Sequence, residues 1–212
     1  LGMCFAIISG GIDLSVGSML CAMGAILMWL IDPNKGLLMK IGLTGAPAYI
    51  IAILIILVLG YVLGTINGSL VAYGKLPPFI ATLGTMKIYR SVTQQLTKSF
   101  NPEVPAGFKA ITATKIGGQV FLPIVYWVIV VVIMYLIFSK TSFGRHTIAI
   151  GSNERAAKLS GINVRFYHIM AYVISGLFAG LAAVAYSAIF ATVQPGTGAG
   201  FELDAIGGAI VG

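Results

Sequence analysis

Side chains that could act as acids, bases, nucleophiles or metal ligands are few and widely separated in this sequence. Its 212 residues include six acids and two histidines. Asp13, Glu202 and Asp204 each stand beside a predicted helix start, where capping of the helix accounts for them. The glycine-rich run 194–200 lacks the preceding strand and following lysine of a phosphate loop, so a hinge or re-entrant turn is expected there. The sequence therefore predicts no catalytic residue and no metal site, and it provides little for a proton-driven carrier.

The densest charge lies in the polar segment 140–165, which separates two apolar stretches. Its bases are Lys140, Arg145, Arg155, Lys158 and Arg165, against the single acid Glu154. A high local density of bases favours the cytoplasmic side of a membrane. We therefore expect 140–165 to be a cytoplasmic loop, with Lys75 on the same side and the loops 32–47 and 97–119 on the other.

A short surface helix is predicted inside this loop. Asn153 can cap its start, and Gly161 can end it in a left-handed turn. Glu154 and Lys158 form an i,i+4 pair in the favourable orientation. The face between these ends is small and smooth, and is made of Ala156, Ala157, Leu159 and Ser160. We expect this helix to dock against another protein, and the alternative is a solvated linker whose charges only set the topology.

Composition places the chain in a membrane. Charged residues make up 9% of the sequence and hydrophobic ones 58%, with a mean hydropathy of +0.98. Soluble domains carry roughly a quarter charged residues. The net charge of +7 fits cytoplasmic loops beside anionic lipid better than nucleic acid, because the bases are scattered among apolar segments.

The apolar segments predict an all-α, polytopic membrane helix bundle forming a single domain over residues 1–212. Spanning helices are expected at 49–73, 121–138 and 166–190, with a shorter helix at 79–89 and a last apolar segment from about residue 205. The chain begins and stops inside apolar runs, so we expect an interior fragment of a longer protein.

Residues 1–31 are too long for one simple span and are interrupted near Gly10 and Gly11. We expect a helix, a break and a second helix, in which Asp13 or Ser15 caps the second start. An acid in such a place is costly unless capped, paired or hydrated. Asp13 is therefore either a functional residue or simply an N-cap.

Other small polar side chains lie within the apolar helices. Asn67, Thr82 and Thr85 must find hydrogen-bond partners there, so they either tie helices together or line a path for a polar solute. Together with Asp13 and Ser15 they are our candidates for a solute pathway. Glycines at regular spacing predict close helix packing, at Gly60, Gly64 and Gly68 and at Gly176 and Gly180.

Four separated blocks carry a family resemblance that covers nearly the whole chain. They read SGGIDLSVGSM (9–19), INGSLVAYGKLPPFIATLGTM (66–86), FGRHTIAIGSNERAAKLSGINV (143–164) and FELDAIGGAIVG (201–212). In this order they resemble the permease subunits of bacterial ABC importers for ribose, galactose and related monosaccharides. The third block is similar to the cytoplasmic segment that meets the ATPase in that family.

The resemblance implies a multi-pass protein of the bacterial plasma membrane. The residues that it assigns to ATPase coupling are Gly151, Asn153, Glu154, Arg155, Ala156, Ala157, Lys158, Ser160, Gly161 and Ile162. It also implies an ATPase subunit inside, a sugar-binding protein outside and two permease copies, alike or different, surrounded by lipid. No cofactor is expected on this chain, since ATP and Mg²⁺ belong to the ATPase. Two other readings stay open: a stand-alone channel or secondary carrier for a small polar solute, and a non-transporting scaffold.

Overall fold

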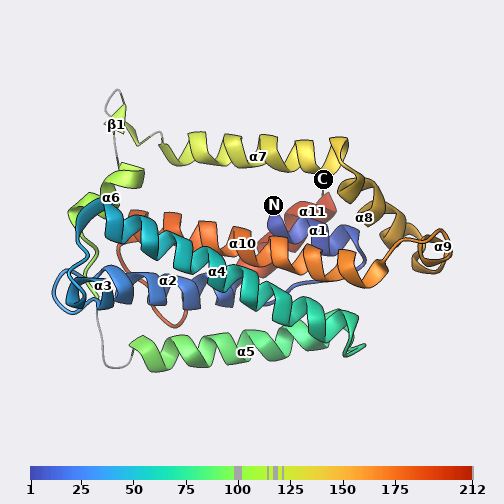
Figure 1. The fold of residues 1–212 in the computed structure, drawn as a ribbon, viewed down its shortest axis with the longest axis horizontal. Helices are drawn as coiled ribbons and strands as arrows, with labels where there is room; N and C mark the ends of the chain where they lie inside the picture. The colour runs from blue at the N-terminus through green and yellow to red at the C-terminus, as the bar shows by residue number, and fades with distance from the viewer. Residues whose placement is uncertain (98–101, 114, 117–118, 121, 212) are drawn as a thin grey trace.

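The computed structural model describes residues 1–97, 102–113, 115–116, 119–120 and 122–211. The described chain is a bundle of helices with one small two-stranded hairpin (Figure 1). Within these residues three helices are long and apolar enough to cross a membrane: α4 (Gly45–Ala72), α7 (Leu122–Lys140) and α10 (Val164–Phe190). The predicted all-α, polytopic membrane bundle is therefore confirmed.

The broken N-terminal helix is present as predicted. α1 (Gly2–Ile8) ends at a turn, and α2 (Val16–Ile31) begins after Ser15. Gly10 has a φ of +85°, a conformation that a residue with a side chain rarely adopts, so the chain leaves α1 at this glycine. α2 is almost entirely buried and forms the centre of the main hydrophobic core with α4 and α10.

Two segments that we predicted as loops contain helices. Within 32–47 there is one helical turn, α3 (Leu37–Lys40), and α4 begins at Gly45 rather than near Tyr49. Within 97–119 lie α6 (Ala106–Ala113) and the antiparallel strands β1 (Lys115–Ile116) and β2 (Gln119–Val120). The glycines and prolines that predicted loops here stand next to these short elements, and apolar side chains such as Phe108 anchor them in the core.

α5 (Pro78–Thr97) is longer than the predicted 79–89. Pro78 occupies the first helical position as expected, because proline fits there without losing a hydrogen bond. The helix continues past Lys87 and Arg90 because the side that faces the bundle carries buried side chains along its length, among them Ala81, Thr85 and Thr93. Its 20 residues correspond to about 30 Å, the thickness of the hydrocarbon layer.

The polar segment 140–165 is mostly helical rather than a loop. α8 (Ser142–Ser152) and α9 (Glu154–Leu159) occupy it, and the spanning helices α7 and α10 enter and leave it. α8 was missed because its polar side chains hide a buried stripe of Gly144, Thr147 and Ile150. The predicted span 121–138 begins at Leu122 in the structure, since Phe121 lies outside the described residues.

The connection 191–200 and α11 (Phe201–Val211) turn back into the bundle (Figure 1). Arg90 on α5 holds this connection, donating to the carbonyl oxygens of Pro195 at 2.8 Å and Thr197 at 2.6 Å. A Cβ on Gly17 of α2 would lie 2.1 Å from the Gly198 oxygen, so the two backbones touch. The expected re-entrant turn is thus a packed part of the structure. α11 begins at Phe201, so residues 201–204 belong to the helix that we expected them to precede.

Candidate functional site

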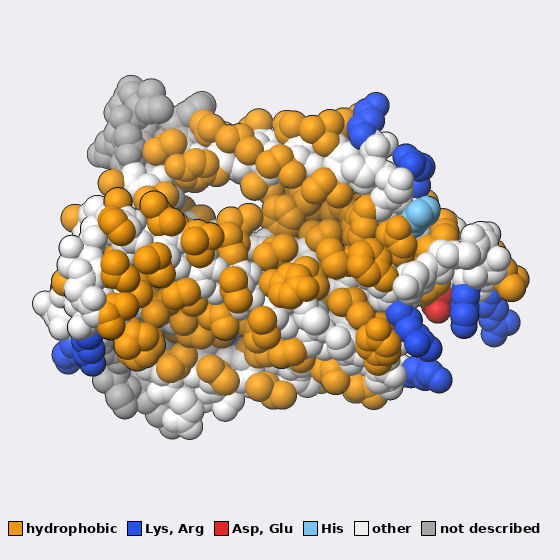
Figure 2. Space-filling view, viewed as in Figure 1, with side chains coloured by type: hydrophobic (Ala, Val, Ile, Leu, Met, Phe, Trp, Pro, Cys, Tyr) orange, Lys and Arg blue, Asp and Glu red, His pale blue; other side chains and the backbone are white. Residues whose placement is uncertain are grey.

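The polar segments that connect the helices lie at two opposite ends of the bundle. At one end, the carboxylate of Asp32 accepts from the backbone N–H groups of Asn34, Lys35 and Glu103, which joins the segments 32–47 and 97–119. At the other end, Lys75 shares a cavity with α9. Figure 2 shows most of the visible Lys and Arg side chains at the end that carries α9. The loops are therefore grouped as expected, with Lys75 beside the segment 140–165 and the segments 32–47 and 97–119 together at the other end.

α9 has the ends that the sequence predicted. The side-chain oxygen of Asn153 accepts from the Ala156 backbone N–H at 3.0 Å, and Gly161 has a φ of +82°. An Asx cap and a left-handed glycine hold a six-residue helix that would not be stable by itself. The helix is therefore presented in a defined orientation between α8 and α10.

The exposed face of α9 differs from the predicted one. Ala157 is 4% exposed and packs with Ile150 of α8 and Val164 of α10. Its methyl group thus anchors α9 to the bundle and is not available for docking. Asn153 and Glu154 at the start of the helix are exposed, and so are Arg155, Ala156, Lys158, Leu159 and Ser160. We call the last five residues the α9 outer face. Leu159, at 90% exposure, is an apolar side chain that the described residues leave uncovered.

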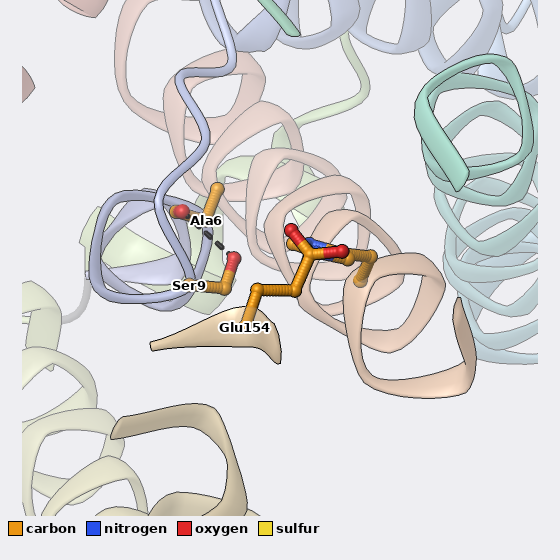
Figure 3. Close-up of polar contacts among 4 residues, drawn as sticks. Ala6, Ser9 and Glu154 are labelled. Carbon is orange, nitrogen blue, oxygen red and sulfur yellow. Dashed lines mark hydrogen bonds and ion pairs between the residues drawn. The ribbon is translucent and has the colours of Figure 1, made fainter. Parts of the chain in front are cut away.

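Glu154 interacts across elements. Its Oε2 lies 4.0 Å from Nε2 of His168 on α10, whereas no ion pair with Lys158 is found among the described residues. Figure 3 shows Glu154 extending from α9 beside Ser9, whose hydroxyl donates to the Ala6 carbonyl oxygen at 2.9 Å. Glu154 therefore brings α9 close to α10 and to the end of α1.

A cavity of about 980 Å³ opens between these elements. Its walls come from the end of α1, the connection from α4 to α5, the region of α8 and α9, and the start of α10. Lys75, Lys158 and Arg165 line it together with Glu154, so the lining carries more positive than negative charge. The Arg165 guanidinium lies 5.6 Å above the Tyr73 ring, which holds it at the cavity edge.

Gly151 links the docking region to the broken helix. A Cβ at this position would lie 1.8 Å from the Ile8 carbonyl oxygen, so α8 touches the backbone at the end of α1. Only glycine allows this approach.

At the break, Asp13 is fully buried and hydrogen bonded. Its Oδ1 accepts from the Ser15 backbone N–H at 3.0 Å and from the Ser15 hydroxyl at 2.6 Å. Its Oδ2 accepts from the Ser175 hydroxyl of α10 at 2.8 Å. The alternative that Asp13 is the N-cap of α2 is wrong, because Ser15 occupies that position and no side chain caps the helix. Asp13 instead ties the break to a spanning helix.

Two more of the predicted pathway residues, Asn67 and Thr82, are hydrogen bonded to the break, and a third, Thr85, is bonded to Thr82. Asn67 of α4 donates from Nδ2 to the Ser15 hydroxyl at 2.7 Å, and its Oδ1 accepts from the Tyr89 hydroxyl at 3.2 Å. Thr82 donates to the Ile12 carbonyl oxygen at 3.1 Å. Thr85, one turn further along α5, donates to the Thr82 carbonyl oxygen at 3.2 Å. We call Asp13, Ser15, Asn67, Tyr89 and Ser175 the polar junction.

The polar junction joins α2, α4, α5 and α10 through side chains that are hidden from solvent in this chain. Ser175 and Tyr89 were not among the predicted residues. Ser175 stands next to Gly176 in a small-residue stripe, and Tyr89 precedes Arg90 at what we took for the end of a helix. The available signal was the same as for Asn67, namely a polar group in an apolar helix.

The two predicted glycine sets face each other across α4 and α10. A Cβ at Gly60 would lie 2.5 Å from the Gly176 oxygen, and one at Gly64 would lie 2.4 Å from the Tyr172 oxygen. Gly68 meets the Ile169 backbone in the same way, at 2.7 Å, whereas Gly180 has a looser 3.3 Å contact with the Ile56 oxygen. The helices therefore touch backbone to backbone along most of this face.

Among the described residues, no group of three or more His, Cys, Asp or Glu side chains is arranged to hold a metal ion. Cys4 and Cys21 are both free thiols.

The fold defines an integral membrane protein built as a helix bundle, with the exposed basic helix α9 at one end. The chain belongs to the family described as the permease component of branched-chain amino acid transport systems, which matches residues 1–212. The ribose import permease of Bacillus subtilis is 37% identical over the whole chain and 62% of its own length. The D-allose transport permease of Escherichia coli is 35% identical, with 62% of its length covered.

The galactose/methyl galactoside import permease of Escherichia coli is 30% identical over 65% of its length and the whole of this chain. The chain therefore spans slightly less than two thirds of the curated relatives that it matches. No solved structure matches it. The predicted membership of a transport permease family is confirmed, and its curated relatives carry the names of sugar importers.

Proposed function

We propose that the protein is the membrane-spanning subunit of an ATP-driven importer for a monosaccharide in the bacterial plasma membrane. The observation that carries this proposal is the match of the entire chain to permeases named for ribose, allose and galactose import. The family description names branched-chain amino acids instead, so a panel of solutes must separate the two classes.

In this proposal the α9 outer face docks against a separate ATPase subunit. Its chemistry suits a protein partner, because a fully exposed leucine beside two cationic side chains and two small ones offers both apolar and charge-assisted contacts. The neighbouring basic cavity would accept acidic groups of that partner. ATP and Mg²⁺ bind to the ATPase, and this chain has no catalytic role.

The path from docking to transport runs through named contacts. ATP binding moves α9 with α8, and Gly151 transmits the motion to the end of α1. Through the polar junction, α2 then shifts its position relative to α4, α5 and α10. As a result the bundle rocks against a second copy of the permease. A sugar-binding protein outside delivers the sugar. Asp13, Ser15, Asn67, Thr82 and Thr85 remain our proposed pathway residues, opened to the sugar by that motion.

The docking step is tested by affinity purification of the full-length protein in mild detergent. We expect an ATPase to copurify with the wild type and to be lost from Leu159→Asp, because a buried carboxylate would replace an apolar contact. Ala157→Trp is unsuitable, since Ala157 is buried. Ile41→Asp is the matched control, because Ile41 is also exposed (64%) and lies at the opposite end.

A stand-alone channel or carrier makes the opposite prediction. It would purify without an ATPase, and Leu159→Asp would leave solute uptake unchanged. That result would contradict the proposed function and would return the segment 140–165 to the role of a solvated linker. A non-transporting scaffold would show no solute dependence with any variant.

A further inference from the structure

α5 carries a polar stripe on the side that faces away from the bundle. Its inner residues include Thr82, Thr85 and Tyr89, all buried. On the opposite side of the helix, exposed residues recur every three or four positions, which places them on one face. They are Gly84, Lys87, Ser91 and Gln94, and we call them the α5 polar face.

Lys87 lies near the middle of α5, whose 20 residues match the thickness of the hydrocarbon layer, although the helix is less apolar than the three candidate spans. It is the tenth of the 20 residues of α5, about 14 Å from the first residue. α5 runs alongside α2, whereas α4 comes close to it only near the connection between α4 and α5 (Figure 1). The inner contacts of α5 reach Ile12 near one end and Pro195 further along, so the helix crosses the same layer as its neighbours.

An exposed ammonium at this depth is not compatible with lipid. A lysine at the centre of the hydrocarbon layer costs about 2.5–3.5 kcal/mol or more, and a stem of four carbons does not reach either boundary from there. Lys87 has no ion pair within the part of the chain that the structure describes. Its exposed neighbours Ser91 and Gln94 also need hydrogen-bond partners. Water or protein must therefore cover this face.

We propose that the α5 polar face lines the water-filled passage through which the solute moves, between this chain and a second copy. This inference rests on the proposed function and adds the surface that the sugar contacts. The ammonium, hydroxyl and amide groups supply both donors and acceptors for sugar hydroxyl groups. Gly84 leaves open space, because a Cβ there would meet no atom of this chain within 4 Å.

Other apolar helices provide the comparison. The outer side of α7 is almost wholly apolar, and Val132, near its middle, is 50% exposed. Val58 of α4 is 61% exposed and also apolar. These positions have the character of lipid contacts at a similar depth. They differ from the α5 polar face in that their exposed side chains are apolar.

The test is labelling with a charged, water-soluble thiol reagent in intact membranes. The full-length protein is first freed of its cysteines, including Cys4 and Cys21, and Lys87→Cys, Ser91→Cys and Gln94→Cys are then introduced singly. Val132→Cys and Val58→Cys are the matched controls. We expect the α5 variants to react at least about tenfold faster, because the hydrocarbon layer excludes water and the reagent. The transported sugar should slow their labelling.

Two results would overturn the inference. Labelling of the α5 variants as slow as that of Val132→Cys would mean that protein covers this face. Fast labelling that the sugar leaves unchanged would mean that the water there does not belong to the passage. Sugar uptake by the wild type is measured beforehand, and its absence would contradict the proposed function instead. With uptake present, the labelling decides about the α5 polar face alone.

Discussion

Two buried aspartates join separate segments of the chain, one inside the bundle and one at its end. Both act as hydrogen-bond acceptors. Asp13 accepts from two serine hydroxyl groups and a backbone N–H inside the bundle. Asp32 accepts from three backbone N–H groups at the end opposite α9. A carboxylate is suited to this task, because its two oxygens accept several hydrogen bonds at once.

Replacing Asp13 with alanine should destabilise the bundle. The change leaves the Ser15 and Ser175 groups without an acceptor, and each buried unpaired group costs about 1–3 kcal/mol. Thermal unfolding of the purified full-length protein in detergent should show a lower midpoint. Ser175→Ala is the control and should shift the midpoint less, since Asp13 keeps its bonds to Ser15. Equal midpoints for Asp13→Ala and the wild type would contradict the role of the junction.

Asp32 should give the protein an acid-sensitive component of stability. Burial alone would raise the pKa of its carboxyl group, but three backbone N–H donors outweigh burial and lower that pKa. The charged form is therefore favoured in the folded state. The stability that it contributes is fully present above the unfolded pKa of about 4, and is lost as the pH falls through the lower folded pKa.

We expect Asp32→Ala to lose about 2–3 kcal/mol of stability at neutral pH, since hydrogen bonds to a charged group are strong. The difference between the unfolding midpoints of wild type and variant should become smaller as the pH is lowered from 7 to 3. A difference that stays constant through this range would show that the charge of Asp32 does not contribute.

At the scale of helices, close backbone contact between α4 and α10 builds the bundle. Gly64→Val should push these helices apart, because a Cβ there would lie 2.4 Å from the Tyr172 oxygen. Overpacking of this kind costs about 1–3 kcal/mol or more. Gly180→Ala is the control on the same face, where the nearest atom is 3.3 Å away. The unfolding midpoint in detergent should fall for Gly64→Val and change little for Gly180→Ala; equal shifts would contradict the packing argument.

The contact of α8 with α1 should be needed for coupling. Gly151→Val would separate α8 from the Ile8 carbonyl while leaving the α9 outer face intact. We expect the ATPase to stay bound and sugar uptake to fall strongly relative to ATP hydrolysis. Gly207→Ala is the control, because a Cβ at Gly207 meets nothing within 4 Å. Uptake by Gly151→Val at the wild-type ratio to hydrolysis would show that motion does not pass through this contact.

Local signals predicted the elements that depend on local chemistry. The break at Gly10, the cap at Asn153 and the left-handed turn at Gly161 each follow from neighbouring residues. The sequence did not reveal α8 or the full length of α5. The residues in their buried stripes are covered only because they pack against other helices, namely α1, α2 and α4. The burial of Ala157 and the bond of Ser175 to Asp13 depend in the same way on partners far along the chain.

At the scale of the whole molecule, the basic segment that contains α9 and the α5 polar face lie on different parts of the apolar bundle. α9 and the cavity beside it lie at one end, the loops tied by Asp32 lie at the other, and the α5 polar face runs between them. The polar junction sits inside, where it contacts α2, α4, α5 and α10. In the proposed function these parts are the place for the ATPase, the link to the spanning helices and the hydrophilic passage.

The measurement that tests this account most directly is solute uptake by cells that depend on the full-length protein. Labelled ribose, allose and galactose are compared with labelled leucine, in the wild type and in Leu159→Asp. We predict ATP-dependent uptake of at least one sugar, no uptake of leucine, and loss of sugar uptake in Leu159→Asp but not in Ile41→Asp. Uptake of leucine alone, or sugar uptake that persists without ATP and in Leu159→Asp, would contradict the account.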